Sequence, residues 1–337
     1  MDLKASEDLV SVIIPCYNRK DLLLSLLNSL QQQSYRALEI IIIDDYSTEN
    51  IKEAVENAFP NVAVIRCRQR FGPAFAKNLG ILKARGRYLL FLDSDTEIIH
   101  ADMIGNMARI FNAKRALGQV GGEVSLQNNI ICASGENISY DGKTISKTIP
   151  LLEDKNNSLA FCDYITTSNC FVEKKTIVKL GGFDPYYIYP GEDKDLGFRF
   201  KKEGYLNGFC PGAVAKHRAS PVAGCKTYFY DFYRTKLRFS LKHKGLKMLF
   251  ITPLFDIIRG CLVVSSELYY KLTGKKRDIA YVRVRLQAGN LGIAYLRALC
   301  NNLKMLSNIH YSHGRNYLSP TSFKKFVIFA QGNYLFR

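Results

Sequence analysis

The stretch Tyr88–Asp95, with the sequence YLLFLDSD, decides the fold of this chain because an apolar run ends abruptly in two carboxylates. The run has the composition of a strand that is buried on both faces of a sheet. Asp93 and Asp95 follow it at spacing i, i+2, and burying both acids is unfavourable unless a cation lies close to them. Such carboxylates suit Mg²⁺ or Mn²⁺, which prefer oxygen ligands and often share them with substrate phosphates. The alternative is a solvated acidic turn, which is the commoner origin of an isolated Asp-x-Asp.

The first third of the chain alternates apolar runs with helical patterns. We predict strands over 9–15, 38–43, 61–66 and 87–92, and helices from Asn18 or Asp21 to about 33 and over 72–85. Strands that are buried on both faces and separated by helices indicate an α/β fold with a doubly wound, mostly parallel sheet. Ligands bind such sheets at the carboxyl ends of the strands. Four acids fall at those ends: Asp44, Asp45, Asp93 and Asp95.

The middle of the chain has a different character. Residues 119–149 are rich in Gly, Asn and Ser and predict hairpins, while 151–160 predict a mobile polar loop. Strand character returns over 162–172. A helical pattern then runs from Asp193 to Glu203 and ends before Gly204.

The positive charge is concentrated in the C-terminal third. The net charge is +17, and residues 234–337 hold 19 Lys and Arg against three acids, a net +16. We therefore predict a nearly neutral domain over 1–225 and a basic helical region over 226–337. So basic a region predicts an acidic partner: an anionic membrane surface, a phosphorylated substrate or nucleic acid.

An amphipathic basic helix is predicted directly after Cys225. Its apolar row is Phe229, Tyr233, Leu237 and Leu241, and its basic row is Arg234, Arg238 and Lys242. Residues 246–272 are more apolar but contain Asp256, Arg259 and Glu267, so they lie at a bilayer interface or pack on the domain. No uninterrupted run of 18 or more apolar residues occurs, so no spanning helix is predicted. The C-terminal helices could also pair two protomers.

Cysteine usage and the N-terminus point to the cytosol. The nine cysteines are scattered without C-x-x-C spacing, which argues against a zinc site or a disulfide framework. Residues 1–8 carry three acids, and Pro15 interrupts the apolar run that follows, so this run predicts a first strand and not a signal peptide. We expect a cytoplasmic protein that is peripherally associated with the inner face of the cell membrane.

Taken in order, the motifs resemble the family 2 glycosyltransferases of GT-A fold. The matching segments are VIIPCYN at 12–18, IDDYS at 43–47, FLDSD at 91–95, GGFD at 181–184, EDKDL at 192–196, and His217. The resemblance covers about residues 9–221. A looser likeness links 228–244 to the helix after the catalytic domain in bacterial O-antigen and rhamnan-type transferases. It implies inverting, metal-dependent transfer of one sugar to a hydroxyl of a lipid-linked glycan acceptor in cell-surface polysaccharide biosynthesis.

The resemblance assigns residues 9–118 to a nucleotide-sugar half. The residues that it implies for this role are Pro15, Tyr17, Asn18, Asp44, Asp45, Lys77, Asn78, Asp93 and Ser94. Tyr17 would flank the base. Asp45, with Asp44 as the less favoured alternative, would accept a hydrogen bond from the base. Asp93 would approach the ribose or the donor sugar. UDP or dTDP is the expected nucleotide, with GDP as the alternative. Lys77 stands where the family commonly has arginine and lacks its bidentate fork, which leaves a diphosphate role open.

The same resemblance assigns residues 119–225 to an acceptor half.

The resemblance also implies a metal site. Asp95 would hold Mn²⁺ or Mg²⁺ on the diphosphate, and His217 would add a metal or phosphate contact unless it is a structural histidine. A metal neutralises the charge that develops on a nucleoside diphosphate leaving group. Asp193 matches the acceptor-side catalytic base, with Glu192 and Asp195 supporting it. The alternative for these three acids is a solvated helix start.

Two other classes of protein compete with this interpretation. A sugar-nucleotide nucleotidyltransferase would need an early Gly-x-Gly-x-x-x-Arg loop, which is absent. A membrane or nucleic-acid binder with an inert transferase-like domain fits the charge, but no nucleic-acid motif accompanies it, and we expect no nucleic-acid partner. The chain has no tryptophan and so lacks the Gln-x-x-Arg-Trp signature of processive synthases, which favours transfer of a single sugar.

Overall fold

The structure is a computed structural model that describes residues 8–114, 116–126, 131–133, 135–145, 159–187, 190–218, 228–256, 258 and 296–300. The described residues divide into two compact units. The first holds 8–137 and 145–218, and the second holds 138–144 and 228–300, each with the gaps given above. The predicted boundary at 225, most of the predicted loop 151–160 and nearly all of the chain after 258 lie outside the described residues.

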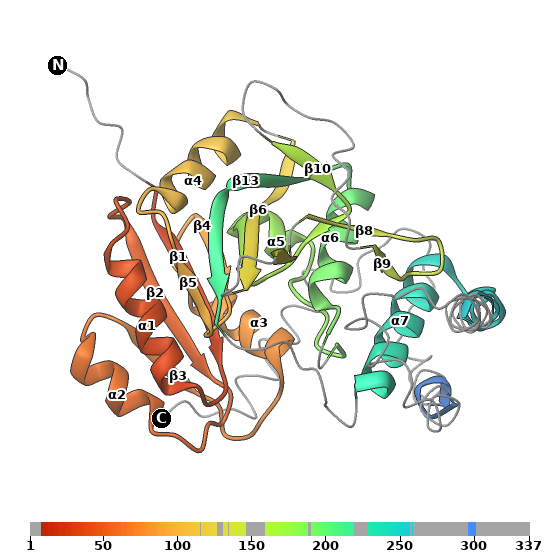
Figure 1. Cartoon of the computed structure of the whole chain (residues 1–337), viewed down its shortest axis with the longest axis horizontal. Helices are drawn as coiled ribbons and strands as arrows, with labels where there is room; N and C mark the ends of the chain where they lie inside the picture. Colours follow the sequence, from red (N-terminus) through yellow and green to blue (C-terminus); the bar gives the residue numbers. More distant parts are fainter. Residues whose placement is uncertain are drawn as a thin grey trace, which may run out of the picture. The chain divides into compact units, whose positions relative to one another are not determined.

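The first unit is built on a mixed sheet (Figure 1). Its strands are β1 (Val10–Cys16), β2 (Leu38–Asp44), β3 (Ala63–Arg66), β4 (Tyr88–Leu92), β6 (Leu117–Leu126), β10 (Ala160–Cys162), β12 (Asn169–Glu173) and β13 (Leu206–His217). They follow the order β10-β13-β6-β12-β4-β1-β2-β3. The half formed by β3, β2, β1 and β4 is parallel, and β12 runs antiparallel to β4. The predicted α/β fold with a mostly parallel, doubly wound first half is confirmed.

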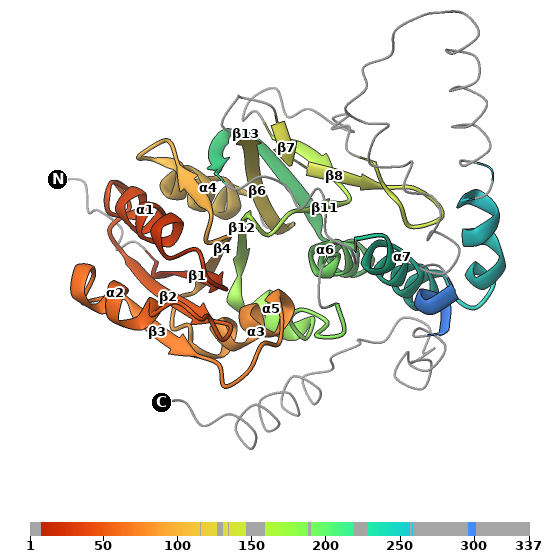
Figure 2. The same cartoon turned by 60° about the horizontal axis from the view of Figure 1, so that its bottom comes forward.

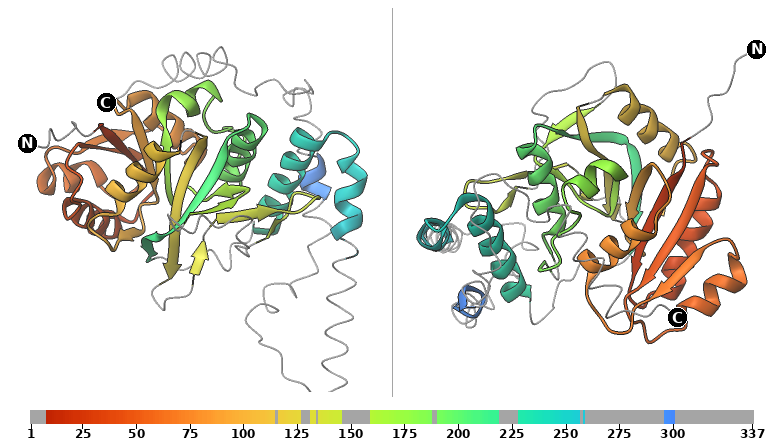
Figure 3. Two further views of the ribbon diagram at one scale, coloured as in Figure 1. Left: turned by 90° about the horizontal axis from the view of Figure 1, so that it is seen from above. Right: turned by 180° about the vertical axis from the view of Figure 1, so that it is seen from behind.

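Helices cover both faces of this sheet (Figures 2 and 3). On one face lie α1 (Lys20–Gln31), α2 (Ile51–Ala58) and α4 (Met103–Ala113). On the other lie α3 (Pro73–Lys83), α5 (Lys174–Lys179) and α6 (Glu192–Lys202). The sequence analysis did not predict α2 or α4, and the two helices complete the layer that α1 begins.

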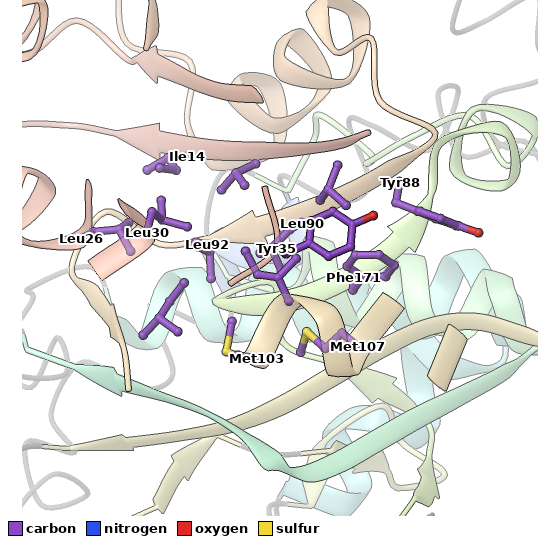
Figure 4. Packing of buried hydrophobic residues seen from close by; sticks show 14 of the residues in the cluster. Ile14, Leu26, Leu30, Tyr35, Tyr88, Leu90, Leu92, Met103, Met107 and Phe171 are labelled. Atoms are coloured by element: carbon purple, nitrogen blue, oxygen red, sulfur yellow. The ribbon is translucent and has the colours of Figure 1, made fainter. Parts of the chain in front are cut away.

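Strand β4 lies at the centre of the two hydrophobic cores. Leu90 and Leu92 pack into the cluster with α1 and α4 (Figure 4), while Leu89 and Phe91 pack into the cluster with α3 and α6. Every residue of β4 is buried, as the sequence predicted for Tyr88–Leu92. Each such side chain stabilises the fold by about 1.5–3 kcal/mol. The end of β4, and with it Asp93, therefore has a fixed position in the sheet.

The region predicted as hairpins contains a long core strand. β6 pairs in parallel with β13 and antiparallel with β12, and only its outer end joins the short hairpin strand β7 (Ile131–Ala133). A small second sheet has the order β11-β8-β9, with β11 (Tyr164–Ile165), β8 (Gly135–Ile138) and β9 (Thr144–Ile145). The glycines of β6 had suggested turns, but a Cβ at Gly122 would lie 1.7 Å from the carbonyl oxygen of Ala213 on β13. These glycines allow close backbone approach within the sheet.

In the second unit, the helix predicted after Cys225 is present as α7 (Tyr228–Lys244), but its predicted basic surface is wrong. Leu237 and Leu241 are fully buried, and so are Arg234 and Arg238, at 6% and 2% exposure. Lys236 is also buried, in ion pairs described below. Most of the Arg and Lys side chains on α7 are therefore buried inside the second unit and do not form a basic surface. Among the described residues, no helix combines the length and the apolarity that crossing a bilayer requires.

Candidate active site

Three metal-ligating side chains meet at the end of β4. Asp93, Asp95 and His217 each offer one atom, and these atoms lie within 4.8 Å of one another. The Nε2 atom of His217 is 3.1 Å from Oδ1 of Asp95 and 3.9 Å from Oδ2 of Asp93. Asp95 is almost fully buried, whereas Asp93 and His217 are partly exposed. The structure thus brings together the two acids of the YLLFLDSD stretch and a histidine 122 positions after Asp95.

The sheet itself positions His217. Strand β5 (Thr96–Ile98) starts directly after Asp95 and pairs antiparallel with the end of β13, which places His217 opposite Thr96. The backbone N–H of Arg218 donates to the carbonyl oxygen of Asp95 at 2.8 Å. The distance between the histidine and the two acids is therefore set by backbone pairing, which a flexible loop would not provide.

Arg19 supplies a positive charge to this cluster. Its guanidinium forms an ion pair with Oδ2 of Asp95, although the arginine itself is 43% exposed. Arg19 and the preceding Asn18 both have positive φ, at 66° and 57°, a conformation that non-glycine residues rarely adopt. Strained backbone of this kind is concentrated at functional sites. The sequence motif that predicted this part of the site ends at Asn18, so Arg19 was not predicted. The signal in the sequence was a cation directly after that motif.

The cluster fits a divalent cation. Oδ1 of Asp95 is buried and lies 3.1 Å from Nε2 of His217, so a cation that takes the place of the histidine proton would contact both atoms. Hydrogen bonds to Asp93 and Asp95 raise the pKa of His217 to about 10. Desolvation of Asp93 would raise its pKa, but His217 and Lys77 outweigh this effect and the pKa lies below its ordinary value. Two oxygens and one imidazole nitrogen form a donor set suited to Mn²⁺ or Mg²⁺.

Two further acids lie at the end of β2, and both hold loops. Asp44 accepts hydrogen bonds from the backbone N–H of Ser47 at 2.8 Å and from Arg66 at 2.7 Å. Asp45 accepts from the backbone N–H groups of Phe71 at 2.7 Å and Gly72 at 2.8 Å. Burial raises the pKa of Asp45, and these two donors offset only part of the shift. The oxygens of both acids therefore fix the strand-end loops, beside any role in binding a base.

The loop after β1 presents an aromatic ring to solvent. Tyr17 is 37% exposed, and the guanidinium of Arg70 lies 4.0 Å from the centre of its ring. The side chain of Asn18 accepts a hydrogen bond from the N–H of Thr48, which ties this loop to the loop after β2. Pro15 lies within β1 opposite Ile43. Ser94 is buried in the turn between Asp93 and Asp95. A half-exposed ring at a strand end is suited to stacking against a base.

A buried lysine links α3 to α6. Lys77 forms an ion pair with Glu192 at 2.8 Å and also donates to the hydroxyl of Thr167, and both charged side chains are almost fully buried. Desolvation lowers the pKa of Lys77, but the charges of Glu192 and Asp93 outweigh it, so the pKa is raised and the ammonium stays protonated. Lys77 is thus held by the acceptor-half acid Glu192, and its charge also acts on Asp93. Thr167 was not predicted, and nothing in its local pattern distinguishes it.

The N-terminus of α6 carries the predicted catalytic acid. Asp193 accepts a hydrogen bond from the N–H of Lys194 at 2.7 Å. Burial, together with the charge of Glu192, raises the pKa of Asp193 to about 7, while the charge of Lys77 opposes the rise. A carboxylate with a pKa near neutrality is suited to general base catalysis.

Asp195 and Asn78 fix the surroundings of this helix. Asp195 holds Arg199 at 2.9 Å, and Arg199 donates to the carbonyl oxygens of Leu180 and Gly182. The amide of Asn78 is hydrogen-bonded to both the N–H and the carbonyl oxygen of Phe183. Both polar atoms of Asn78 are therefore engaged by the backbone of the GGFD turn, which lies just before α6.

The metal cluster should bind a cation more tightly as the pH rises. His217 must lose its proton to become a ligand, and its pKa of about 10 lies above the working range. We expect Mn²⁺ affinity, measured by calorimetry between pH 6 and 8.5, to rise by up to about tenfold per pH unit. The His217→Asn variant should lose most of this slope, while His100→Asn, an exposed histidine in the same domain, should keep it. An equal slope in the wild-type protein and the His217→Asn variant would contradict this assignment.

Comparisons with known proteins agree with the fold and the motifs. Residues 11–128 match the sequence profile of Glycosyl transferase family 2. The amylovoran biosynthesis glycosyltransferase AmsB of Erwinia amylovora is 29% identical over 273 residues, which cover 77% of this chain and 81% of AmsB. The putative teichuronic acid biosynthesis glycosyltransferase TuaG of Bacillus subtilis is 38% identical over 90 residues, 26% of this chain and 36% of TuaG.

Solved structures show the same fold. The GalNAc-T7 structure with UDP, GalNAc and Mn²⁺ has a TM-score of 0.58 at 17% identity, covering 74% of this chain and 53% of that one. The mannosyltransferase PcManGT of Pyrobaculum calidifontis, in complex with GDP-Man and Mn²⁺, has a TM-score of 0.55 at 16% identity, covering 89% of this chain and 88% of that one.

The sheet order, the strand-end acids and these likenesses define an α/β protein of GT-A fold. Residues 11–128, about a third of the chain, are similar to glycosyl transferase family 2. The matches to other curated relatives are short and span between 13% and 37% of those proteins' lengths. The family match is therefore confined to residues 11–128, and the division into a nucleotide-sugar half and an acceptor half stays a prediction.

Proposed function

We propose that this protein transfers a single sugar, with inversion, from a nucleoside-diphosphate sugar to a hydroxyl of a glycan acceptor in surface polysaccharide biosynthesis. The observation that carries the proposal is the joint presence of the Asp93, Asp95 and His217 cluster and of Asp193, whose pKa is raised to about 7. The first is suited to a cation on a diphosphate, and the second to a proton acceptor for the attacking hydroxyl. AmsB and TuaG, which the chain resembles, are named for the biosynthesis of such polymers.

In the proposed reaction, Asp193 accepts the proton of the acceptor hydroxyl as its oxygen attacks the anomeric carbon. The bond from that carbon to the terminal phosphate oxygen breaks, and the nucleoside diphosphate leaves with the electron pair. A divalent cation, when bound by Asp95, His217 and Asp93, supplies positive charge for the leaving diphosphate. Arg19 adds a guanidinium beside the same carboxylates. Tyr17 offers its exposed ring to the base, and UDP or dTDP is the donor nucleotide that we favour. A lipid-linked acceptor and a cytoplasmic-face location complete the proposal.

The experiment that tests this function is nucleoside diphosphate release from a panel of UDP-, dTDP- and GDP-sugars, with Mn²⁺ or Mg²⁺ and with a chelator. We expect slow hydrolysis of one donor that requires metal. The Asp95→Asn variant should abolish it to the level of the chelated protein, because Asp95 is the buried acid of the cluster. Asp102→Asn, an exposed acid near the start of α4, serves as the matched control and should match the wild type. No turnover of any donor, or equal turnover by the Asp95→Asn variant, would remove the enzyme proposal.

The pH dependence should report Asp193. The base form is required, so kcat/KM should fall by about tenfold per pH unit below pH 7, with a midpoint near the raised pKa. The charge of Glu192 contributes to that pKa, and so the Glu192→Gln variant should move the midpoint to lower pH. Glu203→Gln, at the exposed far end of α6, should leave the midpoint unchanged. Asp193→Asn should lower the plateau by about 10²–10⁴-fold. If the midpoint of the kcat/KM profile were the same in the Glu192→Gln variant and in the wild type, the assignment of Asp193 as the base would be contradicted.

A further inference from the structure

The helical segment that follows α7 has an exposed apolar row. Leu246, Phe250, Leu254 and Ile258 recur every four residues, and they are 49%, 81%, 54% and 48% exposed. Backbone hydrogen bonds from Leu249 to Leu246 and from Ile251 to Lys247 begin the helix. Side chains at i, i+4 and i+8 lie on one side of a helix. The four side chains therefore form one stripe, called here the apolar stripe, on the segment after α7.

The opposite side of the same segment is unusually polar for a buried face. Thr252 is fully buried, and Asp256 forms an ion pair with Lys236 of α7, a lysine that is only 1% exposed. Lys236 also pairs with the buried Asp141 at 2.8 Å. Met248 on the same face is fully buried, Asp256 contacts α7 through Lys236, and the neighbouring Phe255 lies 6.4 Å, between ring centres, from Tyr140 in the turn at 139–143. A helix in contact with water would show the reverse arrangement, with its charges outside and its leucines inside.

Positive charge accompanies the stripe, on the exposed Lys247 in the structure and in the composition of the C-terminal third of the sequence. Lys247 is exposed beside Leu246, and Lys242 is half-buried one turn earlier. Residues 234–337 carry 19 Lys and Arg against three acids. Two copies of so basic a region would repel each other, so a second copy of the chain is disfavoured. Anionic lipid matches both features, because the acyl boundary accepts apolar side chains while the headgroups attract lysine.

We propose that the apolar stripe inserts into the interface of an anionic bilayer, with the surrounding lysines on the headgroups. This narrows the membrane contact, which the sequence predicted for 226–337 as a whole, to residues 246–258. The membrane proposal concerns where the protein binds and not the chemistry of the active site. Its test is therefore independent of the test of the proposed function.

The absence of tryptophan from the chain permits a direct test. In the full-length Phe250→Trp variant, the single indole would report on the stripe. With vesicles of phosphatidylcholine and phosphatidylglycerol, we expect a blue-shifted emission that brominated lipids quench at least about twofold. The control is Leu206→Trp, which replaces a leucine that is 43% exposed in the first unit and should be neither shifted nor quenched. Pure phosphatidylcholine vesicles should bind either variant far less, because the attraction of lysine to anionic headgroups is missing.

A second pair of variants tests the energetics. Phe250→Ser combined with Leu254→Ser should weaken vesicle flotation at least about tenfold. Donor turnover in solution, or thermal unfolding if no donor is found, should remain at the level of the wild type and show that the variant is folded. The proposal is overturned if the wild-type protein does not float with anionic vesicles at low salt. It is also overturned if the indole at position 250 stays unquenched while the protein is bound, or if that indole is shielded by concentration-dependent dimerisation without lipid.

Discussion

The first unit depends on neutralising the carboxylates that its sheet gathers at the ends of β2 and β4 and at the start of α6. Each buried acid there has a specific partner. Asp44 has Arg66, Asp45 has two backbone N–H groups, Asp95 has Arg19, and Glu192 has Lys77. A buried charge without its partner would destabilise a protein by several kcal/mol. The fold therefore brings three cations and two backbone N–H groups to these acids, and that requirement shapes the loops around the site.

The same requirement separates carboxylates into structural and chemical groups. Asp44, Asp45 and Asp195 hold loops and turns through hydrogen bonds and ion pairs. Oδ1 of Asp95 is buried beside Nε2 of His217, and the pKa of Asp193 is raised to about 7 by burial and by the charge of Glu192, against the opposing charge of Lys77. Lys77 connects the two halves of the domain, since it joins α3 to α6 and its charge reaches both Asp93 and Asp193. One buried ammonium thus influences both the cation cluster and the proposed base.

Much of this site could be predicted from the sequence, because the signals are local. The apolar run of β4 fixes Asp93 and Asp95 at a strand end, and the EDKDL segment places Asp193 at a helix start. His217 came only from the resemblance, since its position depends on pairing between β5 and β13 that no local pattern encodes. Arg66 is the last residue of β3, and so it lies at the carboxyl end of a strand just as Asp44 does, but the sequence analysis did not predict it. The core strand β6 was mistaken for hairpins because its glycines serve close packing. The basic row of α7 was mistaken for a surface because the packing that buries Arg234 and Arg238 leaves no mark in the pattern of the helix itself.

The central claim is that Asp93, Asp95 and His217 bind one divalent cation together with the donor diphosphate. The most direct measurement is anomalous diffraction from crystals grown with Mn²⁺ and a nucleoside diphosphate, with data collected above the manganese edge. The account predicts one strong peak between these three side chains and the diphosphate, with the guanidinium of Arg19 withdrawn from Asp95. A nucleotide bound with no manganese peak there, or with manganese held by other residues while Arg19 still pairs with Asp95, would contradict it.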